Sequence, residues 1–142
     1  MTKIHQVLDA YAQAIYQKDL DQLMQLYTED VVAFDVIERW EYQGKAQWKL
    51  GMGDSFQRLG NDLCRVTFSN LKAEFDEHVA GLHAIVNYQM ISQGENYDKL
   101  YRITMFLRKV GDDWKISHEH VSLPVRKADG RIFYETPKEH QL

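Results

Sequence analysis

The sequence predicts an α+β domain in which three helices come first and a meander of strands follows them. Two observations support this fold class. Apolar residues recur with a helical period over roughly the first sixty residues, and from residue 63 onward they alternate with polar residues. Short segments rich in Gly, Asp, Asn and Glu separate the alternating runs, as expected for turns between strands. We therefore expect helices packed on one face of a strongly curved antiparallel or mixed sheet.

The first two helices are predicted from an apolar stripe and a capping signal. Asp19 followed by Gln22 is a capping-box pattern, so a second helix is expected to begin after a break at residues 18–19. A third helix is expected from Gly44. Its Gly51 and Gly53 would weaken it by roughly 1 kcal/mol each relative to alanine, which suggests a kink or a close backbone approach. The stripe of the first helix consists of Ile4, Val7, Leu8, Tyr11 and Ile15.

The strands are predicted from residue type and alternation. Residues 31–37 have strand composition, and four longer strands are expected near residues 63–76, 79–92, 97–109 and 113–123. We expect residues 1–124 to form a single domain. Residues 125–142 are polar apart from residues 132–134, so we expect a C-terminal arm that is partly ordered or lies at a dimer contact.

Composition restricts the functional classes. The 142 residues contain 44% hydrophobic residues and carry a net charge of −4, with basic residues scattered along the chain. Nucleic-acid partners are therefore not expected, because phosphate binding needs a concentrated basic face. The single cysteine, Cys64, excludes an internal disulfide and a cysteine-based zinc site. With no apolar signal core and no long apolar run, we expect a cytoplasmic protein with no membrane partner.

The last predicted strand combines apolar and polar residues on one face. Strict alternation places Trp114, Ile116, His118 and His120 together, with Glu119 on the opposite face. Such a face is expected to leave the core and enter a polar pocket. The two histidines would then act as acid and base, as donors to a ligand carbonyl or as a metal pair. Alternatively, neighbours at a subunit contact satisfy them. No other motif has zinc-like spacing, so no metal is predicted.

Asp35 is the main candidate for a general base. It interrupts an apolar run between Phe34 and Val36, and burial there would raise its pKa toward the range useful near neutral pH. The alternatives are a solvent-facing aspartate on an edge strand or an ion pair with Arg102. We expect Arg102 and Thr104, which share a face, to point inward; the opposite register would put Arg102 at the surface of a dimer sheet.

Aromatic and apolar residues are expected to complete the pocket. Tyr88 would contribute a hydroxyl from the middle of the sheet. The region after the first strand and the third helix would supply an apolar wall or lid, although a stripe of this kind is also typical of a plain core. The predicted wall consists of Trp40, Tyr42, Trp48, Met52 and Phe56.

Two stretches resemble the NTF2-like superfamily, the cone-shaped fold of ketosteroid isomerases, SnoaL-type polyketide cyclases and the kinase association domain. Residues 18–35 resemble the signature from the second helix to the first strand, and residues 114–122 resemble the final strand of the SnoaL-like branch. The resemblance covers residues 3–124. It implies that Asp35 takes the place of the proton-moving aspartate and Tyr11 that of the tyrosine donating to the oxyanion.

The second oxyanion donor of ketosteroid isomerases, a protonated acid, would map near Thr104 or Phe106, where this sequence has no acid. Arg102, Thr104, His118 or His120 would then supply a different donor set.

The functional hypothesis is a cofactor-independent isomerase or lyase, of isomerase, dehydratase or cyclase type. It would bind a small, partly apolar carbonyl compound. Asp35 would move a proton alpha to the carbonyl, and Tyr11, His120 and Arg102 would stabilise the enolate oxygen. The alternative is a non-catalytic ligand-binding or assembly module of the same fold, and both readings predict a homodimer. The expected ligand-binding residues are Trp40, Trp48, Met52, Tyr88, Arg102, Thr104 and His118.

Overall fold

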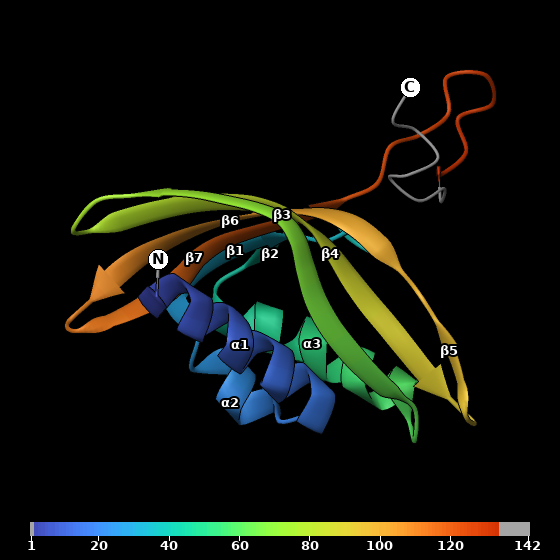
Figure 1. Ribbon diagram of the computed structural model, residues 1–142, viewed down its shortest axis with the longest axis horizontal. Coiled ribbons are helices and arrows are strands. Elements are labelled where there is room, and N and C mark those ends of the chain that lie inside the picture. The colour runs from blue at the N-terminus through green and yellow to red at the C-terminus, as the bar shows by residue number, and fades with distance from the viewer. Residues whose placement is uncertain (1, 134–142) are drawn as a thin grey trace.

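The computed structural model describes residues 2–133, and its helices lie under the concave face of one curved sheet (Figure 1). This arrangement confirms the α+β class. The helices are α1 (Thr2–Gln17), α2 (Leu20–Met24) and α3 (Lys45–Leu59). The strands are β1 (Tyr27–Phe34), β2 (Tyr42–Gln43), β3 (Leu63–Phe75), β4 (Val79–Ser92), β5 (Glu95–Tyr97), β6 (Leu100–Val110) and β7 (Asp113–Ser122).

The sheet is mixed because one pair of neighbouring strands, which come from opposite ends of the chain, runs in parallel. The strand order is β2-β1-β7-β6-β4-β3, with β5 paired to β4. The β1–β7 pair is parallel, and the other pairs are antiparallel. The first strand therefore lies beside the last one, which brings residues near position 35 and residues near position 119 into the same part of the molecule.

The helical hairpin at the N-terminus follows the apolar pattern of the sequence. Ile4, Leu8, Tyr11 and Ile15 of α1 are at most 3% exposed. The Asp19 carboxylate caps α2 by accepting a hydrogen bond from the Gln22 backbone N–H. The predicted boundaries differ in one respect. β1 begins at Tyr27 and ends at Phe34, so the strand expected over residues 31–37 starts earlier and is shifted toward the helices.

Gly51 marks a close approach between α3 and β2. A Cβ atom at this position would lie 2.6 Å from Cε1 of Tyr42, a distance that real Cβ contacts do not reach. The structure therefore supports the close-approach explanation for the glycine in this helix. Without a side chain at position 51, the α3 backbone rests directly on the Tyr42 ring.

An extra residue interrupts the pairing of β7 with β6. Ile116 pairs with Leu107 and His118 pairs with Phe106, so Ser117 has no partner of its own and forms a β-bulge. A bulge shifts the alternation of side chains by one residue. Trp114 and Ile116, at even positions, precede the bulge, and Glu119 and Val121, at odd positions, follow it. Ile116, Glu119 and Val121 are all buried, so the bulge places residues from even and odd positions on the same face.

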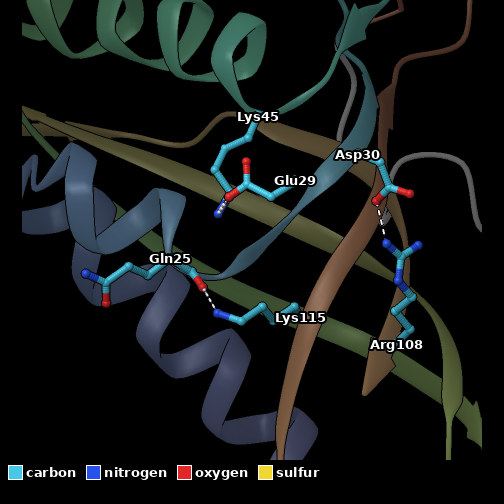
Figure 2. Close-up of polar contacts among 6 residues, drawn as sticks. All are labelled: Gln25, Glu29, Asp30, Lys45, Arg108 and Lys115. Carbon is cyan, nitrogen blue, oxygen red and sulfur yellow. Dashed lines mark hydrogen bonds and ion pairs between the residues drawn. The ribbon is translucent and has the colours of Figure 1, made fainter. Parts of the chain in front are cut away.

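The pairing of β1 with β7 is irregular at the same level, between Tyr27 and Val32. Figure 2 shows how polar contacts hold this segment. Glu29 forms an ion pair with Lys45 of α3, and Asp30 contacts the guanidinium of Arg108 on β6. These contacts hold the two exposed residues of β1, Glu29 and Asp30, against α3 and β6. In the same region, Lys115 donates a hydrogen bond to the Gln25 carbonyl.

Beyond β7 the chain forms a small hairpin that extends away from the sheet (Figure 1). Val125 and Ile132 form its bridge, and the Phe133 N–H donates to the Pro124 carbonyl at 2.9 Å. The rest of the predicted arm, residues 134–142, lies outside the described residues. Within residues 2–133, no helix has the length and apolar content needed to span a bilayer.

Candidate active site

A cavity of about 430 Å³ lies between the concave face of the sheet and the helices. A hollow of about 830 Å³ on the outer face of the sheet is larger, but it contains none of the buried acids or tyrosines. The inner cavity is therefore the better candidate for chemistry. Its apolar lining includes Ile15, Met52, Phe56, Met90 and Val121, and its polar lining includes Tyr11, Asp35, Tyr88 and Glu119, with Arg58, Asp62 and Lys99 at the rim.

Glu119 is a buried acid in the wall of this cavity. It is 2% exposed, and its Oε1 accepts a hydrogen bond of 2.7 Å from the Tyr27 hydroxyl. Burial raises the pKa of Glu119 to about 7, the Tyr27 hydrogen bond lowers it, and the negative charge of Asp35 raises it. Protonated and ionised forms of Glu119 are both accessible near neutral pH. This carboxyl group can therefore donate or accept a proton under physiological conditions.

Asp35 follows the end of β1 and is half-buried. Burial raises the pKa of Asp35, whereas a hydrogen bond from the Val36 N–H (2.8 Å to Oδ1) and the positive charge of Arg58 lower it. Burial is the largest of these contributions, so the net effect raises the pKa of Asp35 above its ordinary value. The negative charge of ionised Asp35 in turn favours the protonated form of Glu119.

Tyr11 and Tyr88 form a hydroxyl pair in the same cavity. Their hydroxyl oxygens are 2.7 Å apart, and either group can be the donor. Burial, followed by the nearby charge of Glu119, raises the pKa of both tyrosines well above the ordinary value, so both remain protonated near neutral pH. One hydroxyl hydrogen joins the two oxygens, which leaves the other for a third group such as a ligand oxygen.

Tyr27 and Trp48 support Glu119 from behind. Their rings are 6.2 Å apart in an edge-to-face arrangement. Burial and the charge of Glu119 raise the pKa of Tyr27, and the nearby indole N–H of Trp48 lowers it. That N–H is buried and has no hydrogen-bond partner among residues 2–133. The aromatic pair holds the Tyr27 hydroxyl toward the Glu119 carboxyl group.

Six of the predicted pocket residues line this cavity. Tyr11 comes from α1, Tyr88 from β4, and Asp35 from the position after β1. The other three, Trp48, Met52 and Phe56, come from α3. The predicted position of Trp40 is wrong. Its side chain is 96% exposed because the chain leaves the sheet between β1 and β2, so Trp40 forms no part of the wall.

The inward orientation predicted for His118 and His120 is also wrong. Because Ser117 adds one residue to β7, both histidines turn to the outer face. There their rings pack against Phe34, at centroid distances of 4.8 and 5.3 Å, and His118 Nδ1 lies 2.6 Å from the Val32 carbonyl oxygen. His120 is exposed and cannot reach a ligand in the inner cavity.

Arg102 and Thr104 likewise face outward rather than inward. The alternate residues of β6, Ile103, Met105 and Leu107, are at most 1% exposed and form the more apolar face, so they take the core side. Arg102 is exposed and donates from Nε to Ser122 Oγ at 3.1 Å instead of pairing with Asp35. Thr104 and Arg102 therefore supply no donor to the inner cavity.

Glu119 is the residue that alternation misses. A change in the apolar pattern of the strand was nevertheless visible: Trp114 and Ile116 occupy even positions, and Val121 and Leu123 occupy odd ones. Such a shift of parity within one strand indicates a bulge.

The other reactive group of the wall, the Cys64 thiol, is neutral because burial raises its pKa to about 11. Within the described part of the chain, no three His, Cys, Asp or Glu residues are arranged to hold a metal ion.

A curved, unclosed mixed sheet with its first and last strands in parallel and three helices on its concave face defines the NTF2-like class of folds. The chain matches the SnoaL-like domain family over residues 4–126 and belongs to that family. No curated protein matches it significantly.

Solved structures agree with the fold. An NTF2-like protein of unknown function from Pseudomonas putida is 20% identical, with a TM-score of 0.82 and coverage of 95% of this chain and 94% of the other. A putative dehydratase of the NTF2-like family from Streptomyces avermitilis is 13% identical, with a TM-score of 0.75 and coverage of 85% and 93%. A putative calcium/calmodulin-dependent protein kinase II association domain from Xanthomonas campestris is 15% identical, with a TM-score of 0.73 and coverage of 84% of each chain.

Proposed function

We propose that the inner cavity binds a small, partly apolar carbonyl compound and that Asp35 moves a proton alpha to its carbonyl group. The observation that carries this proposal is the presence of two carboxyl groups with raised pKa values, Asp35 and Glu119, in the lining of one cavity. An ionised base beside a protonated acid is the arrangement that acid–base catalysis needs. The chemistry would be of isomerase, dehydratase or cyclase type and would need no cofactor.

The proposed steps follow from these positions. Asp35 accepts the proton from the alpha carbon, and the electron pair of the C–H bond shifts onto the carbonyl oxygen to give an enolate. Protonated Glu119, or the free hydroxyl hydrogen of the Tyr11–Tyr88 pair, donates to that oxygen. In an isomerisation, Asp35 then returns its proton to another carbon. In a dehydration, Glu119 protonates a departing hydroxyl group, which leaves as water.

This mechanism sets the direction of the pH dependence. Asp35 must be ionised and Glu119 must be protonated in the active form. The rate is therefore expected to fall as pH rises through about 7, where Glu119 loses its proton. It is also expected to fall at low pH, where Asp35 becomes protonated.

The test is exchange of alpha protons in D₂O, followed by proton NMR over a panel of cyclic and aryl ketones. Asp35→Asn should slow exchange about 10²- to 10⁴-fold, the usual contribution of a positioned base. His120→Ala is the matched control, because His120 lies on the outer face and should leave exchange unchanged. Exchange that continues at the wild-type rate in Asp35→Asn would show that Asp35 is not the base.

The alternative proposal is a non-catalytic binding or assembly module. Its support is the hydrogen bond between Tyr27 and Glu119, because a buried polar pair of this kind also serves as a structural element. The resemblance in fold to a putative kinase association domain is compatible with it. Binding of ketones without proton exchange in any of them would favour this alternative.

We also propose that the outer face of the sheet forms a homodimer. Phe75, Val79 and Phe106 are each more than half exposed and lie around the outer hollow. Exposed apolar side chains grouped on one sheet face usually mark an interface. Phe106→Asp should give a monomer in sedimentation experiments while ligand binding in the inner cavity persists. A wild-type chain that stays monomeric over a concentration series would contradict the dimer.

A further inference from the structure

The charges of the inner cavity are arranged by depth. Arg58 and Lys99 are the two basic residues that line it within residues 2–133, and both are exposed, which places them at its rim. They come from separate elements, the end of α3 and the segment between β5 and β6. Their convergence on one opening is a property of the fold, since they are 41 positions apart in the sequence.

The backbone at Lys99 is held firmly, although its ammonium group is exposed. The Lys99 N–H donates to Asn87 Oδ1 at 3.2 Å, and its carbonyl accepts from the Tyr88 N–H at 2.9 Å. Adjacent Asp98 accepts hydrogen bonds from the Asn87 and Gln89 amides. Lys99 forms no ion pair among the described residues, and its ammonium lies 5.9 Å from the centre of the Tyr97 ring. A cation with a fixed backbone is therefore available at the rim.

Arg58 is only weakly neutralised. Its ion pair with Asp54 spans 3.3 Å between side chains that are 52% and 62% exposed, and exposed pairs of this kind contribute little. The charge of Arg58 acts on Asp35, so its field extends into the cavity. Asp62 is the carboxylate that shares the rim with these cations and offsets part of their charge.

The inner end has the opposite character. Asp35 and Glu119 are acids, and Tyr11 and Tyr88 contribute a pair of hydroxyl groups beside them. A ligand carboxylate placed beside these two acids would be repelled by any negative charge on them. A ligand oxygen that accepts hydrogen bonds is favoured at this end, and an anionic group is favoured only at the rim.

We propose that the ligand is an amphipathic carbonyl compound with a carboxylate at the end opposite its reacting carbonyl, and that Arg58 and Lys99 bind this carboxylate at the rim. The proposal rests on the proposed function and specifies its substrate class and orientation. The carbonyl oxygen points toward Glu119 and the tyrosine pair, the apolar body lies along Met52 and Phe56, and the carboxylate remains near solvent.

The test compares two aryl probes that differ by one carboxylate. 2-Naphthol and 6-hydroxy-2-naphthoic acid share a hydroxyl for the inner end, and only the second carries an anionic group at the far end. Dissociation constants are measured by calorimetry at pH 7 in low salt. The wild-type chain should bind the acid more tightly, and the double variant Arg58→Gln/Lys99→Gln should lose about fivefold or more of that preference. Its affinity for 2-naphthol should stay unchanged.

One further variant tests the direction of the charge effect, and another serves as a control. Asp62→Asn removes the opposing charge and should increase the preference for the acid. Arg65→Gln removes an exposed arginine whose partner is Gln89 and which does not line the cavity, so it should have no effect. Added salt should weaken binding of the acid and leave 2-naphthol unaffected.

The outcomes separate this inference from the proposed function. Equal affinity of the wild-type chain for the two probes, or a preference that survives in the double variant, overturns the inference. Proton exchange that depends on Asp35 would still support the proposed function in that case. A carboxylate preference that depends on Arg58 and Lys99, in a chain that shows no proton exchange, supports the rim site and contradicts the catalytic proposal. If neither probe binds, the rim site is overturned, and proton exchange that depends on Asp35 still decides the proposed function.

Discussion

Glu119 and His120 are neighbours in the sequence but lie on opposite faces of the same sheet. On the concave face, Glu119 is 2% exposed, accepts a hydrogen bond from Tyr27 and has a pKa raised to about 7. On the convex face, His120 is exposed and packs its ring against Phe34. The comparison shows that the face of the sheet decides which polar residue becomes reactive. Histidine, the residue type that ordinarily titrates near neutral pH, lies on the convex face, away from the cavity. On the concave face, burial raises the pKa of a glutamate into that range.

The largest expected effect concerns stability on the concave face. Glu119 is protonated in both states below its ordinary pKa of 4.5, and folding is then unaffected by it. Between that pH and about 7, the unfolded chain loses the proton while the folded chain keeps it, so stability falls with rising pH. The shift corresponds to about 3 kcal/mol above pH 7. Glu119→Gln should remove this loss.

Urea unfolding from pH 4.5 to pH 8 measures this difference. Glu77→Gln, at an exposed position in the β3–β4 turn, is the matched control and should follow the wild-type curve. Parallel pH profiles for wild type and Glu119→Gln would mean that Glu119 is not desolvated in the folded protein.

The next largest expected effect concerns the hydrogen bond that Tyr27 donates to Glu119. Tyr27→Phe removes the donor to Oε1 and should destabilise the fold by about 2 kcal/mol, because a buried acceptor loses its partner. The hydrogen bond lowers the pKa of Glu119, so its loss should raise that pKa further. Carbon-detected NMR titration of the glutamate carboxyl groups measures the shift. Tyr16→Phe, at a tyrosine that is 39% exposed, should change neither quantity.

A deletion tests the origin of the difference between the faces. Removing Ser117 should convert β7 into a regular strand in which Ile116, Glu119 and Val121 still alternate inward. The expected cost is about 1 kcal/mol, from the lost hydrogen bond between Ser117 Oγ and the Phe106 carbonyl. The raised pKa of Glu119 should persist in the NMR titration. A glutamate that titrates near 4.5 in the deletion variant would show that the bulge itself holds Glu119 inward.

The smallest expected effect measures the coupling between the two acids. Asp35→Asn removes a negative charge that raises the pKa of Glu119, so that pKa should fall. Asp129→Asn in the C-terminal hairpin provides the control, since Asp129 makes a local contact with the Arg131 N–H. An unchanged Glu119 titration in Asp35→Asn would mean that the two acids do not interact, and the acid–base pairing would lose its basis.

The sequence predicts the fold well because helical and alternating periods are local properties of the chain. The same periods bring Tyr11, Trp48 and Tyr88 to the cavity. Glu119 cannot be placed by alternation, because the bulge at Ser117 arises from how β7 pairs with β6, and this pairing is not local. For a similar reason, alternation alone leaves two sets of β6 residues that could face inward. The set that is entirely apolar, Ile103, Met105 and Leu107, packs in the core.

Trp40 shows the other limit of sequence reasoning. The sequence predicts that Trp40 belongs to the wall or lid of the cavity, but its side chain lies between β1 and β2 and is 96% exposed. Neighbouring Tyr42 is buried instead and packs against Trp48 at a ring distance of 5.1 Å. Apolar character predicts burial only where the fold brings a second surface into reach.

The contact between Gly51 and the Tyr42 ring has a consequence for how this cavity can diversify. Neither residue lines the cavity, yet together they set how near α3 lies to the sheet. A methyl group at position 51 would meet the Tyr42 ring at 2.6 Å and push the helix outward, carrying Trp48 and Met52 with it. Ligand preference can therefore evolve through a substitution outside the binding surface, while every residue that touches the ligand stays the same.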